Sequence, residues 1–186
     1  LHGTSGGRAI KIERDGRTVK QMVKAEHHRT LGCFFLNHPP LCEFRVSVKG
    51  NHPITRVLPE HFTARDELYL IELQDPGASQ VLLTTELAKD PSPPGFGFVY
   101  DEDTSLQPDG KTRVLGYARQ TGLGEIVYVG LGHCNAARPN GPLAAASDTA
   151  SRGPASPASP AVRGVWETEA FSRLVQNAIA WGIEER

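Results

Sequence analysis

The spacing of apolar residues along the chain predicts two helices. In residues 168–181 the apolar positions recur every three or four residues, which places them on one helical face: Phe171, Leu174, Val175, Ala178 and Ile179. Thr168 can cap the start of this helix, and Gly182 can cap its end. A weaker pattern of the same kind predicts a helix over residues 17–31, which Gly32 would terminate.

Alternating or continuous apolar runs predict strands at residues 43–48, 67–73, 80–85, 113–119 and 125–131. The first of these alternates as a half-exposed strand does. The last contains the run IVYVGL, which is apolar throughout, as expected for an interior strand covered by helices on both faces. A glycine-containing turn separates the last two segments, so they should form a hairpin. Together these elements predict a mixed α/β fold.

Length and composition favour a single domain, 1–186, with one insertion. Residues 135–163 form a low-complexity insertion, and within it residues 147–161 hold only small side chains, prolines and two charges. We therefore expect a mobile loop there. The formal net charge of −1 gives no basic surface for nucleic acid, and no apolar run approaches the roughly 18 residues of a membrane helix. Three cysteines are expected to be free thiols, which favours a cytoplasmic location.

Two histidines lie beside glycines at the expected ends of strands. His133 follows the apolar strand in GLGHC and should project at its carboxyl edge, as a catalytic group or, alternatively, as a histidine that caps a loop. His2 lies in LHGTSGG, where the amides of a small-residue run, including Gly3 and Thr4, could hold an anion or a hydroxylated ligand. The alternative for this run is a plain turn.

A pair of carboxylates opens the predicted strand at residues 67–73. Asp66 and Glu67 could supply a general base or accept hydrogen bonds from sugar hydroxyls, although solvated charges are equally common at a strand start. Tyr69 would share a strand face with Glu67 and could pack against a sugar ring. We therefore expect Glu67 to be catalytic and Tyr69 to contact substrate.

Three other histidines have structural explanations beside functional ones. His28 closes the predicted helix, where the helix dipole suffices to explain it, but it could also face a cleft. His38 and His52 each precede a proline. We interpret His52 as structural and keep His28 and His38 as candidate substrate-binding residues.

A metal site is a further candidate. The spacing of Cys33, His38 and Cys42 matches no common zinc pattern. Ligands gathered from separate loops are not restricted by spacing, so a divalent metal such as zinc could be held by His2 and His133.

Several segments occur in the order of one known family: LHGTSGG, LGCFFLNHPP, NHPITRVLPEHF, DELYLIEL, GEIVYVGLGHC and FSRLVQNAIAWG. Their combination resembles the ThuA-like (trehalose utilisation) family. The resemblance implies a flavodoxin-like three-layer sandwich of the class I glutamine amidotransferase-like superfamily and a role in carbohydrate metabolism. Family members carry strands before the segment that matches LHG, so the resemblance also implies that the N-terminal part of the family fold is absent from this chain.

Three functions remain open from the sequence. The first is an enzyme or enzyme component that acts on trehalose or a related sugar or keto-sugar, with His2 and His133 transferring protons or binding metal and Glu67 as the carboxylate. The second is a noncatalytic carbohydrate-binding or interaction module, and the third is a remnant without independent function. Glutamine hydrolysis is not expected, because LHGTSGG holds no cysteine nucleophile. The expected partner is a small-molecule sugar rather than nucleic acid or membrane, with a homo-oligomer as an open alternative.

Overall fold

A five-stranded antiparallel sheet forms the centre of the protein. The computed structural model describes residues 2–136 and 161–183. The sheet has the order β5-β4-β7-β8-β9, built from β4 (Cys42–Val48), β5 (His61–Asp66), β7 (Ser79–Glu86), β8 (Thr112–Thr121) and β9 (Gly124–Val129). Shorter antiparallel pairs are β1 (Arg8–Arg14) with β2 (Arg17–Val23), β3 (Cys33–Asn37) with β6 (Leu70–Leu73), and β10 (Asn135–Ala136) with β11 (Ala161–Val162).

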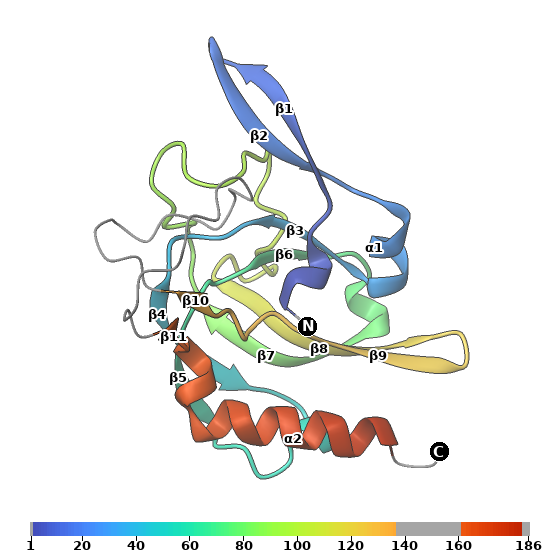
Figure 1. Ribbon diagram of the computed structural model, residues 1–186. Coiled ribbons are helices and arrows are strands. Elements are labelled where there is room, and N and C mark those ends of the chain that lie inside the picture. Colours follow the sequence, from blue (N-terminus) through green and yellow to red (C-terminus); the bar gives the residue numbers. More distant parts are fainter. Residues whose placement is uncertain (1, 137–160, 184–186) are drawn as a thin grey trace, which may run out of the picture.

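Helices are few and lie at the margins of the sheet. The two α-helices are α1 (Glu26–Leu31) and α2 (Glu169–Ile183), and short 3-10 turns are η1 (His2–Ser5), η2 (Pro53–Thr55), η3 (Pro76–Ala78) and η4 (Gly164–Glu167). Figure 1 shows α2 below the central sheet, the β3–β6 pair above it, and the β1–β2 hairpin projecting at the top. In the described ranges, no helix is long and apolar enough to cross a membrane.

The C-terminal helix forms where its apolar spacing predicts it. Phe171 and Leu174 are buried in the main core together with sheet residues such as Val46 and Val129. The hydroxyl of Thr168 accepts a hydrogen bond from the Phe171 amide, which confirms the predicted N-cap. Two details of the prediction are wrong, and both lie past the third turn. Ile179 is 62% exposed, and the helix continues through Gly182 instead of ending there.

The predicted helix over residues 17–31 is wrong, because its first half is a strand. β1 and β2 are joined by Asp15 and Gly16, whose φ angles of 52° and 70° make the two-residue turn that suits a hairpin. Only the last six residues are helical, as α1. Gly32 ends that helix in a left-handed conformation with φ of 88°, as predicted.

The predicted strands form, with two differences that matter for the site. The segments 43–48, 80–85 and 113–119 are strands, and β8 and β9 form the predicted hairpin. In the 67–73 segment only Leu70–Leu73 is a strand, so Glu67 and Tyr69 lie in the β5–β6 connection. β9 is an edge strand with partly exposed residues near its start, so its assignment as an interior strand is wrong.

The fold class is α/β with a mostly sheet core and few helices. Every pair of named strands in the described part of the chain is antiparallel. Parallel neighbours need crossover connections of a dozen or more residues, whereas two residues join β8 to β9. The described strands therefore do not form the parallel central sheet of the expected flavodoxin-like sandwich. The predicted mobile loop, and most of the 135–163 insertion, lie outside the described residues.

Candidate functional site

A cavity of about 1040 Å³ lies between the β1–β2 hairpin, the end of β3, the β5–β6 connection and the segment at residues 90–100. Its lining combines ionisable and aromatic side chains, including Glu67, His133, His38, Tyr69 and Phe96. Ligand pockets of small molecules commonly have volumes of roughly 300 to 1,000 Å³. The cavity therefore has room for a sugar of one or two rings.

Asp66 holds the backbone beneath this cavity. Its carboxylate is fully buried and accepts hydrogen bonds from the amides of Glu67 at 2.8 Å, Gly132 at 2.7 Å and His133 at 3.1 Å. These bonds tie the end of β5 to the segment after β9, 66 residues along the chain. Since its oxygens accept hydrogen bonds from backbone amides, we interpret Asp66 as a structural carboxylate rather than as the general base that its position beside Glu67 in the sequence suggested.

Glu67 lies between two imidazoles. Its Oε2 atom is 3.1 Å from Nδ1 of His133 and 3.8 Å from Nδ1 of His38. Both Glu67 and His38 are buried, while the side chain of His133 is 17% exposed. The shorter distance is that of a hydrogen bond, whereas the longer one is not. His38 Nδ1 instead lies 2.9 Å from the carbonyl oxygen of Pro39, to which a protonated Nδ1 can donate.

Aromatic rings form one wall of the cavity. The His38 ring stacks on Tyr69 with 5.6 Å between centroids, and Phe96 meets His38 edge-on at 5.6 Å. Phe35 packs behind Tyr69 at 4.5 Å. Burial raises the pKa of Tyr69, and the charges of Glu67 and Asp66 raise it further, so its hydroxyl stays protonated. This wall offers apolar ring faces together with a hydroxyl donor.

A second polar group on the cavity lining was not predicted from the sequence. Asp90 accepts hydrogen bonds from the side chains of Asn37 at 3.1 Å and Tyr100 at 2.8 Å, and from the Ser92 amide at 2.8 Å. Burial raises the pKa of Asp90, but these hydrogen bonds outweigh burial and lower it overall, so the carboxylate stays ionised. The segment DPSPPGFGF has no periodicity, and only its prolines and glycines hint at an ordered turn.

The other predicted residues lie apart from the cavity lining or are not fully described. His28 is buried and within hydrogen-bonding distance of the carbonyl oxygen of Ser5 and the amide of Ala25, so it joins the N-terminal segment to α1. Thr4 is exposed, and it is Gly6 of the same run that lines the cavity. The side chain of His2 and the surroundings of Gly3 lie outside the described part. His52 caps η2 by accepting from the Ile54 amide, which confirms its structural assignment.

The described part of the chain contains no ligand set for a metal ion, because no three His, Cys, Asp or Glu side chains there are arranged to hold one. His2, one of the two candidate ligands, has no described side chain, so the pairing of His2 with His133 remains a prediction. Cys33, Cys42 and Cys134 are free cysteines. Burial raises the pKa of the Cys33 thiol to about 11, although a hydrogen bond with Tyr117 opposes this, so the thiol stays protonated at neutral pH.

Comparisons with known proteins identify the family of this chain. No curated protein matches the chain. A crystal structure of a ThuA-like protein from Parabacteroides merdae shares 22% sequence identity and has a TM-score of 0.36. That match covers 72% of this chain but only 39% of the other, so the chain spans well under half of that protein. The family model described as trehalose utilisation (ThuA) matches residues 14–140, which is more than half of the 186 residues. The chain therefore belongs to the trehalose utilisation (ThuA) family.

Proposed function

We propose that the chain binds a sugar or keto-sugar in the cavity and transfers a proton on it with the Glu67–His133 pair. Family membership supports a role related to trehalose utilisation. The observation that carries the chemistry is the 3.1 Å distance between Glu67 Oε2 and His133 Nδ1, both on the lining of one cavity. His2 remains part of the proposal as a second proton-transfer group, on the sequence argument alone.

The pair has the parts of a general base. When Glu67 accepts the hydrogen on Nδ1, the neutral imidazole of His133 carries its lone pair on Nε2. That lone pair can take a proton from a sugar hydroxyl or from a carbon next to a ketone, and the carboxylate stabilises the imidazolium that forms. The same imidazolium can return the proton in the reverse step.

The remaining lining suits a carbohydrate. Tyr69 and Phe96 give the cavity aromatic carbon atoms that can contact the C–H groups of a sugar, and His38 lies between the two rings. Glutamine hydrolysis is not part of the proposal, since Cys33 is a buried, protonated thiol in β3 and Cys42 is half-buried with its pKa raised by burial.

The test is proton exchange on ketoses in D₂O, followed by NMR as loss of the C–H signal next to the carbonyl. We expect exchange with the wild-type chain and a decrease of about 100-fold or more in His133→Gln and Glu67→Gln. His61→Gln is the matched control, because His61 lies on β5 and does not line the cavity. Equal exchange in wild type and both site variants would refute the proposal.

A noncatalytic carbohydrate-binding module is the second candidate, favoured by the aromatic wall, which could hold a sugar without chemistry. Calorimetry with the same ketoses separates the two functions. Binding that is weakened by Tyr69→Ala, with no exchange in the wild-type chain, would favour the module.

A further inference from the structure

We propose that the sugar bound in this cavity carries a phosphate group. The β1–β2 hairpin forms one end of the cavity, and its residues Arg14 and Arg17 hold the phosphate there. This inference rests on the proposed function, because it concerns the same cavity. It adds a substrate class, the sugar phosphates, and a pair of residues that would select it.

The two arginines form an unfavourable pair in the unliganded hairpin. Arg14 and Arg17 are directly opposite in the β1–β2 register, so their side chains leave the same face of the hairpin. Val19 shares that face and is partly buried, and all three residues line the cavity. Like charges directly opposite each other destabilise a strand pair. An anion between them would convert this repulsion into attraction.

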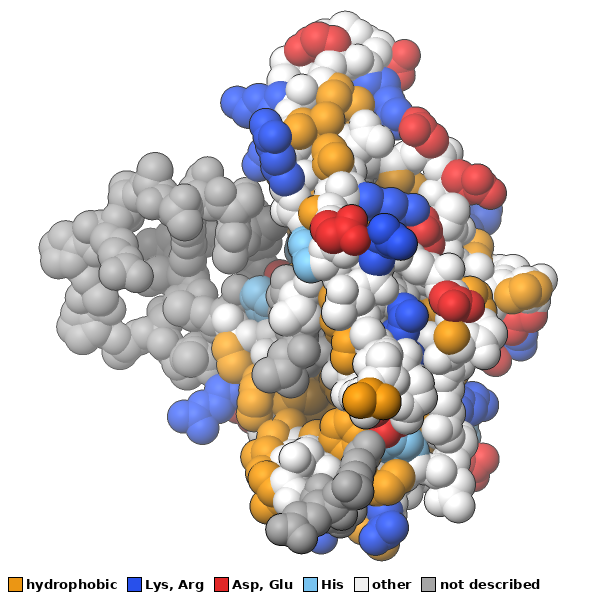
Figure 2. Space-filling view, turned by 90° about the vertical axis from the view of Figure 1, so that its right-hand side faces the viewer, with side chains coloured by type: hydrophobic (Ala, Val, Ile, Leu, Met, Phe, Trp, Pro, Cys, Tyr) orange, Lys and Arg blue, Asp and Glu red, His pale blue; other side chains and the backbone are white. Residues whose placement is uncertain are grey.

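Nearby carboxylates compensate only part of this charge. Asp101 pairs with Arg14. Within the described part of the chain, no carboxylate lies within 4.0 Å of Arg17, which is exposed. Asp15, the nearest acid along the chain, lies exposed in the hairpin turn and forms no ion pair with either arginine within the described residues. Glu13 leaves the opposite face of the hairpin and accepts a hydrogen bond from Thr18. Figure 2 shows Lys and Arg side chains beside hydrophobic and acidic ones on the hairpin at the top of the molecule.

The hairpin contributes only cations to the charged lining of the cavity. Besides the two arginines this is Lys20, whose side chain leaves the opposite face of the hairpin. Of the two acids there, Glu67 lies beside His133, and Asp90 accepts from its own three hydrogen-bond donors. Both acids come from other segments than the hairpin, so a ligand can place its anionic end at the hairpin and its neutral ring near Glu67.

Phosphate is the anion that suits two guanidinium groups best. Each guanidinium presents N–H donors in a planar fork that matches phosphate oxygens, and phosphate has three such acceptors to share between two forks. A carboxylate has two oxygens and one plane, which serves one fork. The volume of about 1040 Å³ has room for a sugar ring together with this group.

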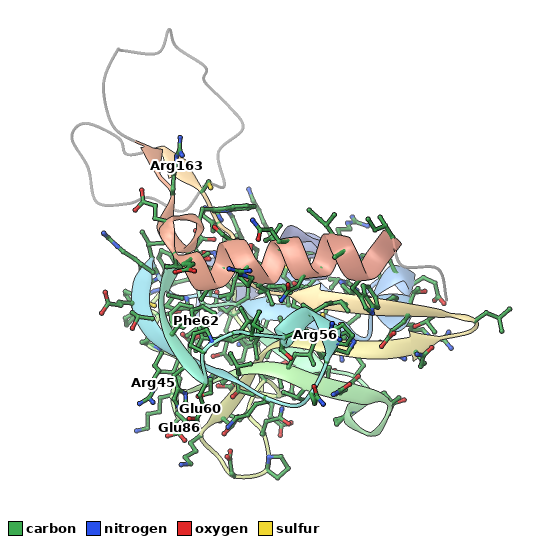
Figure 3. All side chains as sticks on the ribbon, turned by 90° about the horizontal axis from the view of Figure 1, so that it is seen from below. Arg45, Arg56, Glu60, Phe62, Glu86 and Arg163 are labelled. Carbon is green, nitrogen blue, oxygen red and sulfur yellow. The ribbon has the colours of Figure 1, made fainter. Side chains whose placement is uncertain are left out.

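Calorimetry of the 186-residue chain with glucose 6-phosphate, glucose, glucuronate and inorganic phosphate tests this inference. We expect glucose 6-phosphate to bind at least about tenfold more tightly than glucose or glucuronate, and added NaCl to weaken that preference. Arg17→Gln should remove most of the preference while leaving the fold intact, since Arg17 makes no ion pair within the described residues. Arg45→Gln is the matched control: Arg45 is exposed on β4, does not line the cavity, and lies at the margin of the molecule in Figure 3.

Equal affinities for glucose and glucose 6-phosphate would overturn the inference. It would also be overturned if Arg17→Gln left the preference for glucose 6-phosphate unchanged, or if glucuronate bound as tightly as glucose 6-phosphate. These outcomes are independent of the test of the proposed chemistry. If Arg17 selects the phosphate but no ketose exchanges protons, the sugar-phosphate site stands and the proton transfer fails. If neutral ketoses exchange protons through His133 and phosphate has no effect, the reverse holds.

Discussion

Replacing Asp66 with asparagine should destabilise the protein and displace His133. Asn has the same shape but keeps one acceptor oxygen and adds an amide donor. In the asparagine, one of the two side-chain atoms that accept hydrogen bonds in Asp66 is therefore an N–H donor that faces a backbone N–H. If the remaining oxygen accepts from the Glu67 and His133 amides, as Oδ1 does, the new donor faces the Gly132 amide, which now bonds Oδ2 at 2.7 Å.

The magnitude follows from the number of lost bonds. A hydrogen bond to a charged group contributes roughly 1.5 to 3 kcal/mol, so losing one of three bonds in Asp66→Asn should lower the free energy of unfolding by about 2 to 3 kcal/mol. Asp66→Ala loses all three and should cost at least about 4 kcal/mol. Because Asp66 is fully buried, water cannot replace the lost bonds.

Urea unfolding measures this change as a shift of the midpoint at constant slope. Asp15→Asn is the matched control, since Asp15 is exposed in a left-handed turn position that asparagine tolerates, and it should change stability by less than about 0.5 kcal/mol. An unchanged midpoint in Asp66→Asn would refute the assigned hydrogen bonds. A shifted midpoint with unchanged imidazole NMR signals of His133 would refute the positioning role alone.

Three further predictions concern the core, a buried ion pair and the thiols. Leu174→Ala should lower the free energy of unfolding by about 2 to 5 kcal/mol in urea, because Leu174 is buried at the contact between α2 and the sheet. Asp103→Asn should cost about 2 to 4 kcal/mol, because it leaves the buried guanidinium of Arg113 without its charge partner. Burial raises the pKa of Asp103, but Arg113 and the hydrogen bonds from Ser105 together outweigh burial and lower this pKa overall. The ionised Asp103 therefore stabilises the protein above the unfolded pKa and loses its effect as acid protonates the folded carboxylate, so acid unfolding should show a smaller dependence on pH in the variant. A thiol reagent at pH 8 should label exposed Cys134 rapidly and buried Cys33 only after unfolding.

Elements with a local cause were predictable from the sequence. The α2 helix and the β8–β9 hairpin follow from apolar periodicity and turn residues that lie within a few positions of one another. The β1–β2 hairpin also has a local signal, Asp15-Gly16, but the three- and four-residue spacing of Val19, Met22 and Val23 favours a helix. The α/β class was therefore predictable, whereas the antiparallel order of the sheet was not, because pairing depends on contacts distant in sequence.

The candidate site was predictable as residue types but not as an assembly. The sequence indicates functional roles for four of its residues, Glu67, His133, His38 and Tyr69. It also places Glu67 and Tyr69 on one strand, but β6 does not extend to them. No sequence pattern indicated that Glu67 contacts His133, since Glu67 follows β5 and His133 follows β9, two strands far apart in the sequence that do not pair with each other. The Asn37–Asp90 bond spans 53 positions and was missed for the same reason.

The edge position of β9 is what brings His133 to the cavity. The sheet ladder continues through the Gly130 amide, which donates to the Leu115 carbonyl at 2.7 Å. Beyond it the chain bends at Gly132, whose φ of 109° is a conformation that residues with a Cβ rarely adopt. An interior strand would have a neighbour along this side, whereas an edge strand leaves the chain room to turn toward Asp66. The apolar run suggested an interior strand, yet its edge position is what lets the buried carboxylate of Asp66 hold His133 beside Glu67 while the imidazole stays accessible to a ligand.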